Sequence, residues 1–321
     1  MTKRFERMQR DFRLLREGGK APEPDANSPI ELDPQSLLTF VIWGDPQIAH
    51  WSALRSMRFD AACRDLGNMT EPVDALILAG DITENGLPDE FRMVGEILNT
   101  YSGSFRHLLC VPGNHDVRMR PFHKQIAVFN DFLKRVSGGV ALEDETRYFH
   151  AVRIRGFKFI LMGTDRATFE GAYLSARQLR WLDEQIALEN GKPVFVVNHQ
   201  TLKGLNGLPV TWLGKGKWRG SVGRESDKLR AVFEKHRNVI FLTGHLHYGT
   251  SVYNYEDCGA FKSLSVPTVG VVNHGDFPAD TQGYVVSVFE DRIVARSRVF
   301  GDGKYADASI ANATVEIPIE K

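Results

Sequence analysis

The feature that most constrains the fold is a pattern that recurs six times from residue 37 onward. In each instance a short apolar run, rich in β-branched residues, changes abruptly to Gly, Asp, Asn or His. The runs and the residues that follow them are LLTFVIW then GDPQ, ALILA then GD, HLLCVP then GNHD, FKFILM then GTD, PVFVV then NHQ, and NVIFLT then GHLH. Unbroken apolar runs of this length are typical of strands that are buried on both faces. We therefore expect a helix-covered sheet whose strands end in polar turns.

Helices are expected between several of these strands. They span residues 52–66, 88–101, 122–136, 175–189 and 225–236. Ser175 and Gln178 form a capping-box pattern ahead of an amphipathic run. The alternation predicts an α/β layered architecture. After His247 the pattern becomes alternating, in GYVVSVFEDRIVARSRVF and ATVEIPI, and indicates antiparallel strands that either continue the sheet or form a second sheet packed against it.

The first 35 residues form a separate segment. Phe5, Met8, Phe12 and Leu15 recur at helical spacing, and a Pro-, Asp- and Ser-rich linker follows over residues 21–35. Two interpretations stay open for this N-terminal helix: it docks on the body of the protein, or it contacts a partner or a membrane surface. Residues 36–321 are expected to form the main domain.

Charge and cysteine content bound the partners and the compartment. The 321 residues carry a formal net charge of zero at pH 7, so we expect no stable binding to nucleic acid through bulk electrostatics. The three cysteines, Cys63, Cys110 and Cys258, form no metal-binding spacing, which favours a reducing compartment. We find no apolar stretch of roughly 18 residues that would span a bilayer. These features predict a cytoplasmic protein, and they leave its oligomeric state open.

The polar residues at the strand ends have the chemistry of a metal site. Because ligands bind beyond the carboxyl ends of strands in open α/β sheets, these residues are expected at one edge of the molecule. Alone, a Gly-Asp is commonly a turn and a buried histidine is commonly structural, but the joint occurrence behind six strands favours a site. Oxygen and imidazole donors without thiolates suit Mn, Fe, Zn or Mg. The candidates are Asp45, Gln47, Asp81, Asn114, His115, Asp116, Asp165, His199, His245 and His247.

The ordered set GDPQ, GDITENG, GNHD, NH and GHLH resembles the signature of the calcineurin-like metallophosphoesterase superfamily, from residue 40 to about residue 250. The resemblance implies a four-layer β-sandwich of two mixed sheets flanked by helices, and a catalytic domain over residues 36–321. It also implies a hydrolase that acts on a small phosphorylated substrate with two divalent or trivalent metal ions.

The resemblance also implies a role for each matching residue. Asp45 and His247 would bind the first metal, Asp81 would bridge both metals, and Asn114, His199 and His245 would bind the second. His115 would act as the general acid, and Asp116 would orient it.

Gln47 departs from the usual signature, which has a histidine at this position. A glutamine carbonyl can bind a hard cation but donates less strongly than imidazole. The same D-x-Q form resembles two branches of the superfamily, the CSTP-type protein phosphatases and the ADP-ribose/CDP-alcohol diphosphatases. The helix LSARQLRWLDEQI resembles those of bacterial cyclic-nucleotide phosphodiesterases.

A basic, Gly- and Trp-rich insert at about residues 201–225 is the expected specificity element. Lys215, Lys217 and Arg219 could bind a second phosphate, and Trp218 could stack on a base. The other interpretation is an ordinary surface loop. If the insert binds substrate, a phosphodiester or diphosphate of a nucleotide-like molecule is favoured. The alternatives are a protein serine/threonine phosphatase and a metal-binding scaffold without catalysis.

Overall fold

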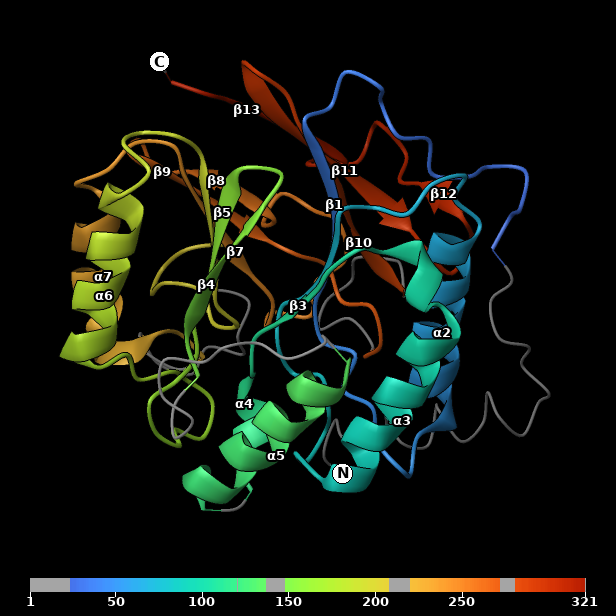
Figure 1. The fold of residues 1–321 in the computed structure, drawn as a ribbon, viewed down its shortest axis with the longest axis horizontal. Coiled ribbons are helices and arrows are strands. Elements are labelled where there is room, and N and C mark those ends of the chain that lie inside the picture. The colour runs from blue at the N-terminus through green and yellow to red at the C-terminus, as the bar shows by residue number, and fades with distance from the viewer. Residues whose placement is uncertain (1–23, 120, 137–147, 208–219, 272–280, 321) are drawn as a thin grey trace.

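The computed structural model describes residues 24–119, 121–136, 148–207, 220–271 and 281–320, and Figure 1 shows their arrangement. The expected N-terminal helix and residues 208–219 of the basic insert lie outside the described residues. The domain boundary at residue 36 therefore stays a prediction. Within the described part of the chain, no helix is both long and apolar enough to cross a membrane.

The first sheet has seven strands and continues into the C-terminal part of the chain. Its strand order is β12-β11-β10-β1-β2-β3, and β13 also pairs with β11. β1, β2 and β3 run parallel, whereas β10 pairs antiparallel with β1. The antiparallel C-terminal strands expected from the sequence therefore extend this sheet. The strands are β1 (Leu38–Trp43), β2 (Ala75–Leu78), β3 (Leu108–Cys110), β10 (Gln282–Val288), β11 (Arg292–Val299), β12 (Lys304–Tyr305) and β13 (Thr314–Pro318).

The second sheet has six strands in the order β4-β5-β6-β7-β9-β8. Its four central strands run parallel, and the two edge strands pair antiparallel with their neighbours. The strands are β4 (His150–Ile154), β5 (Phe157–Leu161), β6 (Val194–Val197), β7 (Val239–Thr243), β8 (Tyr255–Asp257) and β9 (Phe261–Ser265). Both sheets are thus mixed.

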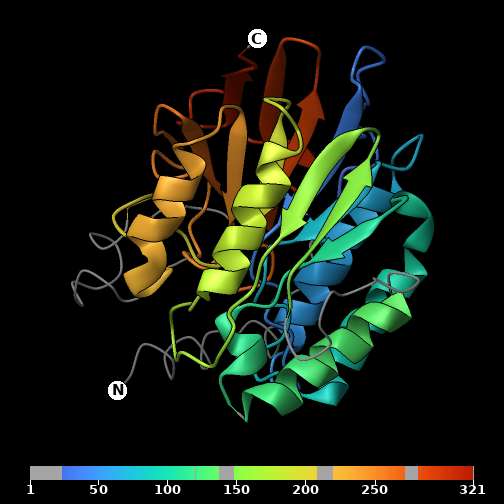
Figure 2. The ribbon, with the colours of Figure 1, turned by 60° about the vertical axis from the view of Figure 1, so that its left-hand side comes forward.

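Helices cover the outer face of each sheet (Figures 1 and 2). α2 and α3 lie beside the seven-stranded sheet, and α6 and α7 lie beside the six-stranded sheet. The expected two-sheet sandwich flanked by helices is confirmed, and all five expected helices form. They are α2 (Ala53–Gly67), α3 (Pro88–Thr100), α5 (Phe122–Val136), α6 (Ala176–Ala187) and α7 (Ser226–Phe233), with the short helices η1 (Ser102–Ser104), α4 (Asn114–Val117) and η2 (Gly223–Glu225).

Aromatic side chains join the inner faces of the two sheets. Phe40 of β1 makes edge-to-face contacts with Phe159 of β5 and Phe195 of β6, with ring centroids 5.4 and 5.1 Å apart. Each such pair contributes about 0.5–1.5 kcal/mol beyond its area burial. On the other face of β1, Trp43 packs against Phe59 of α2. Because side chains alternate between the two faces of β1, this strand packs against the second sheet on one face and against α2 on the other.

The capping box expected at Ser175 forms only in part. The Ser175 hydroxyl accepts a hydrogen bond from the Gln178 main-chain N–H, as expected. The Gln178 side chain instead donates to the Gly163 carbonyl. The carboxylate of Asp165 accepts from the Ser175 N–H, in the place that Gln178 was expected to take. Asp165, a candidate from the sequence, therefore contributes to the start of α6.

The strand registers align the carboxyl ends of the parallel strands. Trp43 is opposite Leu78, and Leu78 is opposite Cys110, so β1, β2 and β3 end at the same level. In the second sheet, Val197 of β6 is opposite Leu242 of β7. The polar residues that follow these strands are consequently brought to one end of the sandwich.

Candidate metal centre

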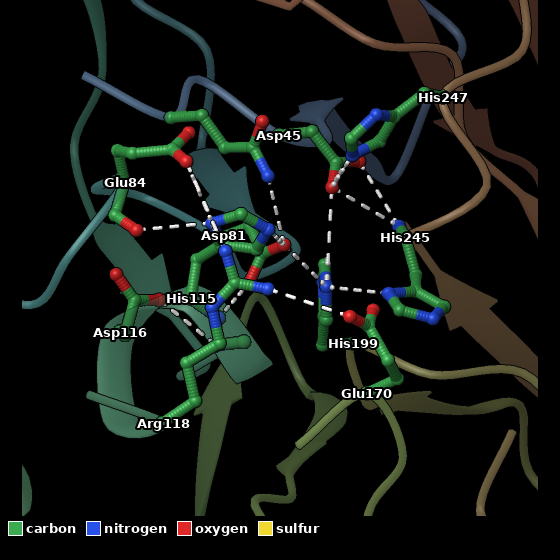
Figure 3. A network of polar contacts seen from close by, with 12 residues as sticks. Asp45, Asp81, Glu84, His115, Asp116, Arg118, Glu170, His199, His245 and His247 are labelled. Atoms are coloured by element: carbon green, nitrogen blue, oxygen red, sulfur yellow. Dashed lines mark hydrogen bonds and ion pairs between the residues drawn. The ribbon is translucent and has the colours of Figure 1, made fainter. Parts of the chain in front are cut away.

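Loops from both sheets meet at this end of the molecule (Figure 3). Asp45, Asp81 and Asn114 follow β1, β2 and β3 of the first sheet. His199 follows β6, and His245 and His247 follow β7, of the second. All six are buried, which is costly for carboxylates and imidazoles unless they have partners of opposite charge.

The carboxylates and imidazoles contact one another directly. His247 Nε2 lies 3.0 Å from Asp45 Oδ1, and His199 Nε2 lies 3.1 Å from Asp81 Oδ2. Two groups of three could each hold a metal ion: Asp45, Asp81 and His247, and Asp81, His199 and His245, with the ligand atoms of each group within 4.8 Å of one another. Asp81 belongs to both groups, and a carboxylate has lone pairs in two directions.

The backbone at these residues is held in an unusual conformation. Asp45, Gln47, Asp81, His245 and His247 all have positive φ, between 42° and 74°. They are five of the eleven non-glycine residues with positive φ in the described part of the chain. Such conformations cost about 1–3 kcal/mol each and cluster at functional sites. The turns therefore aim these side chains at a common point at a cost in stability.

The surroundings of Asn114 and His199 also fit a cation site. Both polar atoms of the Asn114 amide are buried and have no hydrogen-bond partner. His199 Nδ1 lies 2.7 Å from the Ala79 carbonyl, so it donates there and leaves Nε2 directed toward Asp81. A second hydrogen bond of this kind is common in metal-binding histidines. Asn114 and His199 therefore have donor atoms placed for cations.

Gln47 is buried beside the Asp81 carboxylate. Its amide Nε2 donates to Asp81 Oδ2 over 3.1 Å. Rotation of the amide group by 180° would turn its carbonyl oxygen to this side. Gln47 can thus act as a donor to Asp81 or as an oxygen ligand next to it.

Electrostatics in the cluster favours positive charge. Burial raises the pKa of Asp45 to about 7, although His199 opposes the rise. Burial would lower the pKa of His199, but Asp81 and Asp45 together raise it to about 9. His199 and His115 keep the pKa of Asp81 well below its usual range, against the effect of burial. A cation would meet the same demand for positive charge.

His115 lies at the edge of the cluster, at the start of α4. Its main-chain N–H donates to Asp81 Oδ1 over 2.8 Å, and its ring Nε2 lies 3.9 Å from Asp81 Oδ2. Asp81 and Glu84 raise the pKa of His115 despite the opposing effect of burial. The ring thus faces the two ligand groups from one side and favours its protonated form.

The contacts of Asp116 differ from those expected of a residue that orients His115. The Asp116 carboxylate accepts from the N–H groups of Gly113, Ile82 and Thr83, and from the Thr83 hydroxyl. It therefore joins the turns after β2 and β3. The His115 ring instead contacts Glu84, with Nδ1 3.0 Å from the Glu84 carbonyl and 3.5 Å from its carboxylate.

Three charged residues near His115 were not identified from the sequence: Arg55, Glu84 and Arg118. Arg55 lies on α2, and its ion pair with Glu84 joins positions 29 residues apart. Positions so far apart in the sequence form no spacing pattern from which this ion pair could be predicted. Glu84 lies within the GDITENG segment and Arg118 lies two residues after GNHD. Charged residues in or near those motifs were therefore the available signal.

The substrate-binding candidates Lys215, Lys217, Arg219 and Trp218 lie outside the described residues. Their role in binding stays a prediction.

Comparison with known proteins identifies the family of this chain. A model of the calcineurin-like phosphoesterases matches residues 38–249. The chain is 23% identical over 184 residues to the glycerophosphodiester phosphodiesterase GpdQ of Enterobacter lignolyticus, covering 57% of this chain and 59% of that protein. It is 25% identical over 191 residues to the 3',5'-cyclic-nucleotide phosphodiesterase alr5338 of Nostoc sp., covering 59% and 61%. The match thus spans about three fifths of the length of these relatives.

Solved structures share the fold. A dimetal phosphatase from Danio rerio aligns with a TM-score of 0.63 and 15% identity, over 89% of this chain and 100% of that chain. The purple acid phosphatase PPD1 from yellow lupin aligns with a TM-score of 0.58 and 14% identity, over 88% and 53%. At these identities the likeness extends to the fold alone.

Proposed function

The chain belongs to the calcineurin-like phosphoesterase family, and from this premise we propose that it hydrolyses a phosphodiester or diphosphate bond of a small, nucleotide-like molecule. The observation that carries the proposal is the position of Asp81, which is shared by two ligand groups and contacts His115. A site of this kind serves hydrolysis better than metal storage, because a proton donor lies beside it.

The proposed ligands divide between two cations. Asp45 and His247 would hold one, His199, His245 and Asn114 the other, and Asp81 both, with Gln47 beside the first. When bound, such a pair supplies Lewis acidity to the phosphoryl group and lowers the pKa of an attacking water. Four of the six proposed ligands, Asp45, Asp81, His245 and His247, have positive φ, so the fold already holds their costly conformation in the absence of substrate.

His115 would protonate the leaving group. As the water oxygen bonds to phosphorus, the bond from phosphorus to the ester oxygen breaks, and the proton on His115 Nε2 passes to that oxygen. The attacking water releases a proton to solvent as it bonds to phosphorus. His115 then takes up a proton from solvent and returns to its protonated form. General acids of this kind contribute about 10²- to 10⁴-fold to the rate.

The proposed substrate class is supported by the relatives and by the sequence. Two relatives are named as phosphodiesterases of glycerophosphodiesters and of cyclic nucleotides. The basic insert at about residues 201–225 offers cations for a second phosphate. We also propose a cytoplasmic location, which the free thiols of Cys63, Cys110 and Cys258 support.

A substrate panel tests the proposal. The protein, loaded with Mn²⁺, is assayed with bis-p-nitrophenyl phosphate, p-nitrophenyl phosphate, a glycerophosphodiester, cyclic nucleotides, ADP-ribose and a phosphoserine peptide. We expect kcat/KM to be highest for a diester or diphosphate. A preference for the phosphopeptide would identify a protein phosphatase instead, and metal binding without turnover of any substrate would identify a scaffold.

A further inference from the structure

We propose that Phe169 is a specificity-determining residue: its exposed ring is a stacking surface for the planar base of the substrate, on the side of the leaving group. The inference rests on the proposed function and narrows its substrate class to esters whose leaving group carries a base. It starts from an aromatic side chain that the fold leaves in solvent beside the candidate metal centre.

Phe169 lies between β5 and α6, and it is 64% exposed. In the described part of the chain it is the only aromatic residue among the exposed large hydrophobic ones. A phenyl ring in water gains little from the hydrophobic effect, so the core does not explain its presence. Single exposed apolar residues are common on protein surfaces, and the argument therefore depends on where this ring lies.

The loop between β5 and α6 is fixed to the turns around the metal centre. Gln200, which follows the proposed ligand His199, donates from Nε2 to the Gly171 carbonyl over 3.2 Å. The Ala172 N–H donates to the Ser221 carbonyl over 3.1 Å. A Cβ on Gly171 would lie 2.8 Å from that same carbonyl oxygen, so only glycine permits this approach. These contacts give the loop a set position beside the proposed ligand.

Arg118 connects the ring to the proposed proton donor. Its guanidinium carbon lies 5.4 Å from the centroid of the Phe169 ring, within the range of a cation–π contact. Nη2 of the same guanidinium lies 2.8 Å from His115 Nδ1, and Nη1 lies 3.6 Å from Glu170 Oε1. Figure 3 shows Arg118 between His115 and Glu170. One guanidinium therefore separates the exposed ring from the residue that would protonate the leaving group.

An exposed ring beside a guanidinium suits a planar aromatic ligand. Bases stack on aromatic side chains and on the planes of Arg side chains, because every base has a π face. In a nucleotide, one sugar lies between the base and the phosphate, so the base can reach a ring that one guanidinium separates from His115. A glycerol group has no π face. Of the two substrate types named for the relatives, Phe169 thus favours the cyclic nucleotide over the glycerophosphodiester.

The charges around Arg118 favour a neutral base over a second phosphate at this position. Arg118 Nη2 lies 3.8 Å from Glu84 Oε1, and its Nη1 lies 3.6 Å from Glu170 Oε1. The two carboxylates balance the guanidinium and would repel an additional anion. A neutral base meets no such repulsion.

Variants at position 169 separate an aromatic surface from a merely apolar one. Phe169→Tyr keeps the ring, Phe169→Leu keeps an apolar side chain without a π face, and Phe169→Ala removes both. Leu188→Ala is the matched control, because Leu188 is also apolar and is 71% exposed. Leu188 follows α6 and precedes the amino end of β6, whereas the metal centre lies beyond the carboxyl end of that strand. Thermal unfolding of each variant checks that the fold is intact.

The first measurement needs no turnover. Calorimetric titration of the Mn²⁺-loaded protein compares AMP with ribose 5-phosphate, which has a hydroxyl in place of the base. We expect the wild type to bind AMP about 5- to 10-fold more tightly, at the lower end of what base stacking provides because the ring is exposed. Phe169→Ala and Phe169→Leu should lose this preference, whereas Phe169→Tyr and Leu188→Ala should keep it.

The second measurement is the hydrolysis of the methyl esters of AMP and of ribose 5-phosphate. Phe169→Ala should raise KM for the ester that carries the base by a similar factor, with kcat little changed, because stacking is equal in the bound substrate and in the transition state. Its KM for the ribose ester should stay at the wild-type value.

The inference is overturned if the wild type binds both phosphates equally, or if Phe169→Ala or Phe169→Leu keeps the preference for AMP. A base preference that depends on Phe169 in a protein that hydrolyses no ester refutes the proposed function alone. Hydrolysis without a base preference refutes the role of Phe169 alone.

Discussion

At the scale of single residues, the site combines groups that cost stability when considered alone. Buried carboxylates and imidazoles, left-handed backbone at Asp45 and Asp81, and an Asn114 amide without a hydrogen-bond partner are each unfavourable. Cations bound between these groups would interact with all of them and offset their cost in stability. Asp81 is the most informative of them, because both ligand groups include it.

Asp81→Asn should therefore remove metal as well as activity. The amide keeps the size of the carboxylate but loses the charge that both groups share, so we expect less than one bound metal per chain by elemental analysis. Asp165→Asn is the comparison, since Asp165 caps the turn before α6 and belongs to neither group. A fully loaded, active Asp81→Asn protein would refute the bridging assignment.

His150 gives a pH dependence that is independent of the metal site. Burial lowers its pKa to about 4, below the ordinary value of 6.5, and its Nδ1 has no hydrogen-bond partner. The folded state therefore binds the proton less readily than the unfolded state, and stability falls as pH drops from about 6.5 toward about 4. Between pH 7 and pH 5 this group alone should cost about 2 kcal/mol.

Urea unfolding of the metal-free protein at the two pH values measures this loss. In His150→Phe, which keeps a ring against Tyr148, the free energy of unfolding should fall less than in the wild type by that amount. The same measurement on a variant with the exposed His107 substituted provides the comparison. An equal fall in His150→Phe and wild type would show that His150 does not titrate as its burial indicates.

At the scale of elements, the turns after the strands depend on close approach of main chains. A Cβ on Gly113 would lie 2.1 Å from Asp81 Oδ1 and 2.2 Å from the Asp81 main-chain nitrogen. Real contacts of this kind do not occur, so the turn after β3 can meet the turn after β2 only with glycine at this position. Gly113 N–H also donates to Asp116, which joins the same two turns.

Gly113→Ala should separate these turns. We expect a loss of about 1–3 kcal/mol in the free energy of unfolding, as for overpacked sites, together with weakened metal binding. Gly103→Ala is the matched control, because a Cβ there has nothing within 4 Å. Urea midpoints and metal titration of both variants provide the measurement, and metal affinity at the wild-type level in Gly113→Ala would argue against the role of this contact.

The elements were more predictable from the sequence than their contacts. The apolar runs before Asp45, Asp81 and His199 identified strands because burial on both faces leaves an unbroken pattern. The side-chain partners could not be found in the same way. The Gln178 side chain bonds to Gly163 rather than to Ser175, and Glu84 rather than Asp116 contacts the His115 ring. These contacts depend on three-dimensional placement that spacing does not encode.

At the scale of the whole molecule, the candidate centre lies where the two sheets meet. Asp45, Asp81 and Asn114 come from the first sheet, and His199 and His245 come from the second. Away from this end, the contact between the sheets is apolar, as at Phe40 and Phe195. Cations bound at this position would therefore connect the ends of the two sheets with polar ligands from each.

Metal binding should consequently stabilise the entire domain. At a free Mn²⁺ concentration 100-fold above the dissociation constant, one site contributes about 2.7 kcal/mol to the free energy of unfolding. For a chain of this length that corresponds to a rise in Tm of roughly 4 °C. The measurement is calorimetry of the protein after chelation and after Mn²⁺ is restored, with Asp81→Asn as the variant expected to show no rise.

Hydrogen exchange locates the same stabilisation within the fold. Mn²⁺ should slow exchange in the turns after β1 and β2 and in those after β6 and β7, because the proposed ligands come from all four. Exchange in β12 and β13, at the far side of the first sheet, should change only with global stability. Slower exchange in the turns of one sheet alone would mean that the cations bind to that sheet and do not connect the two.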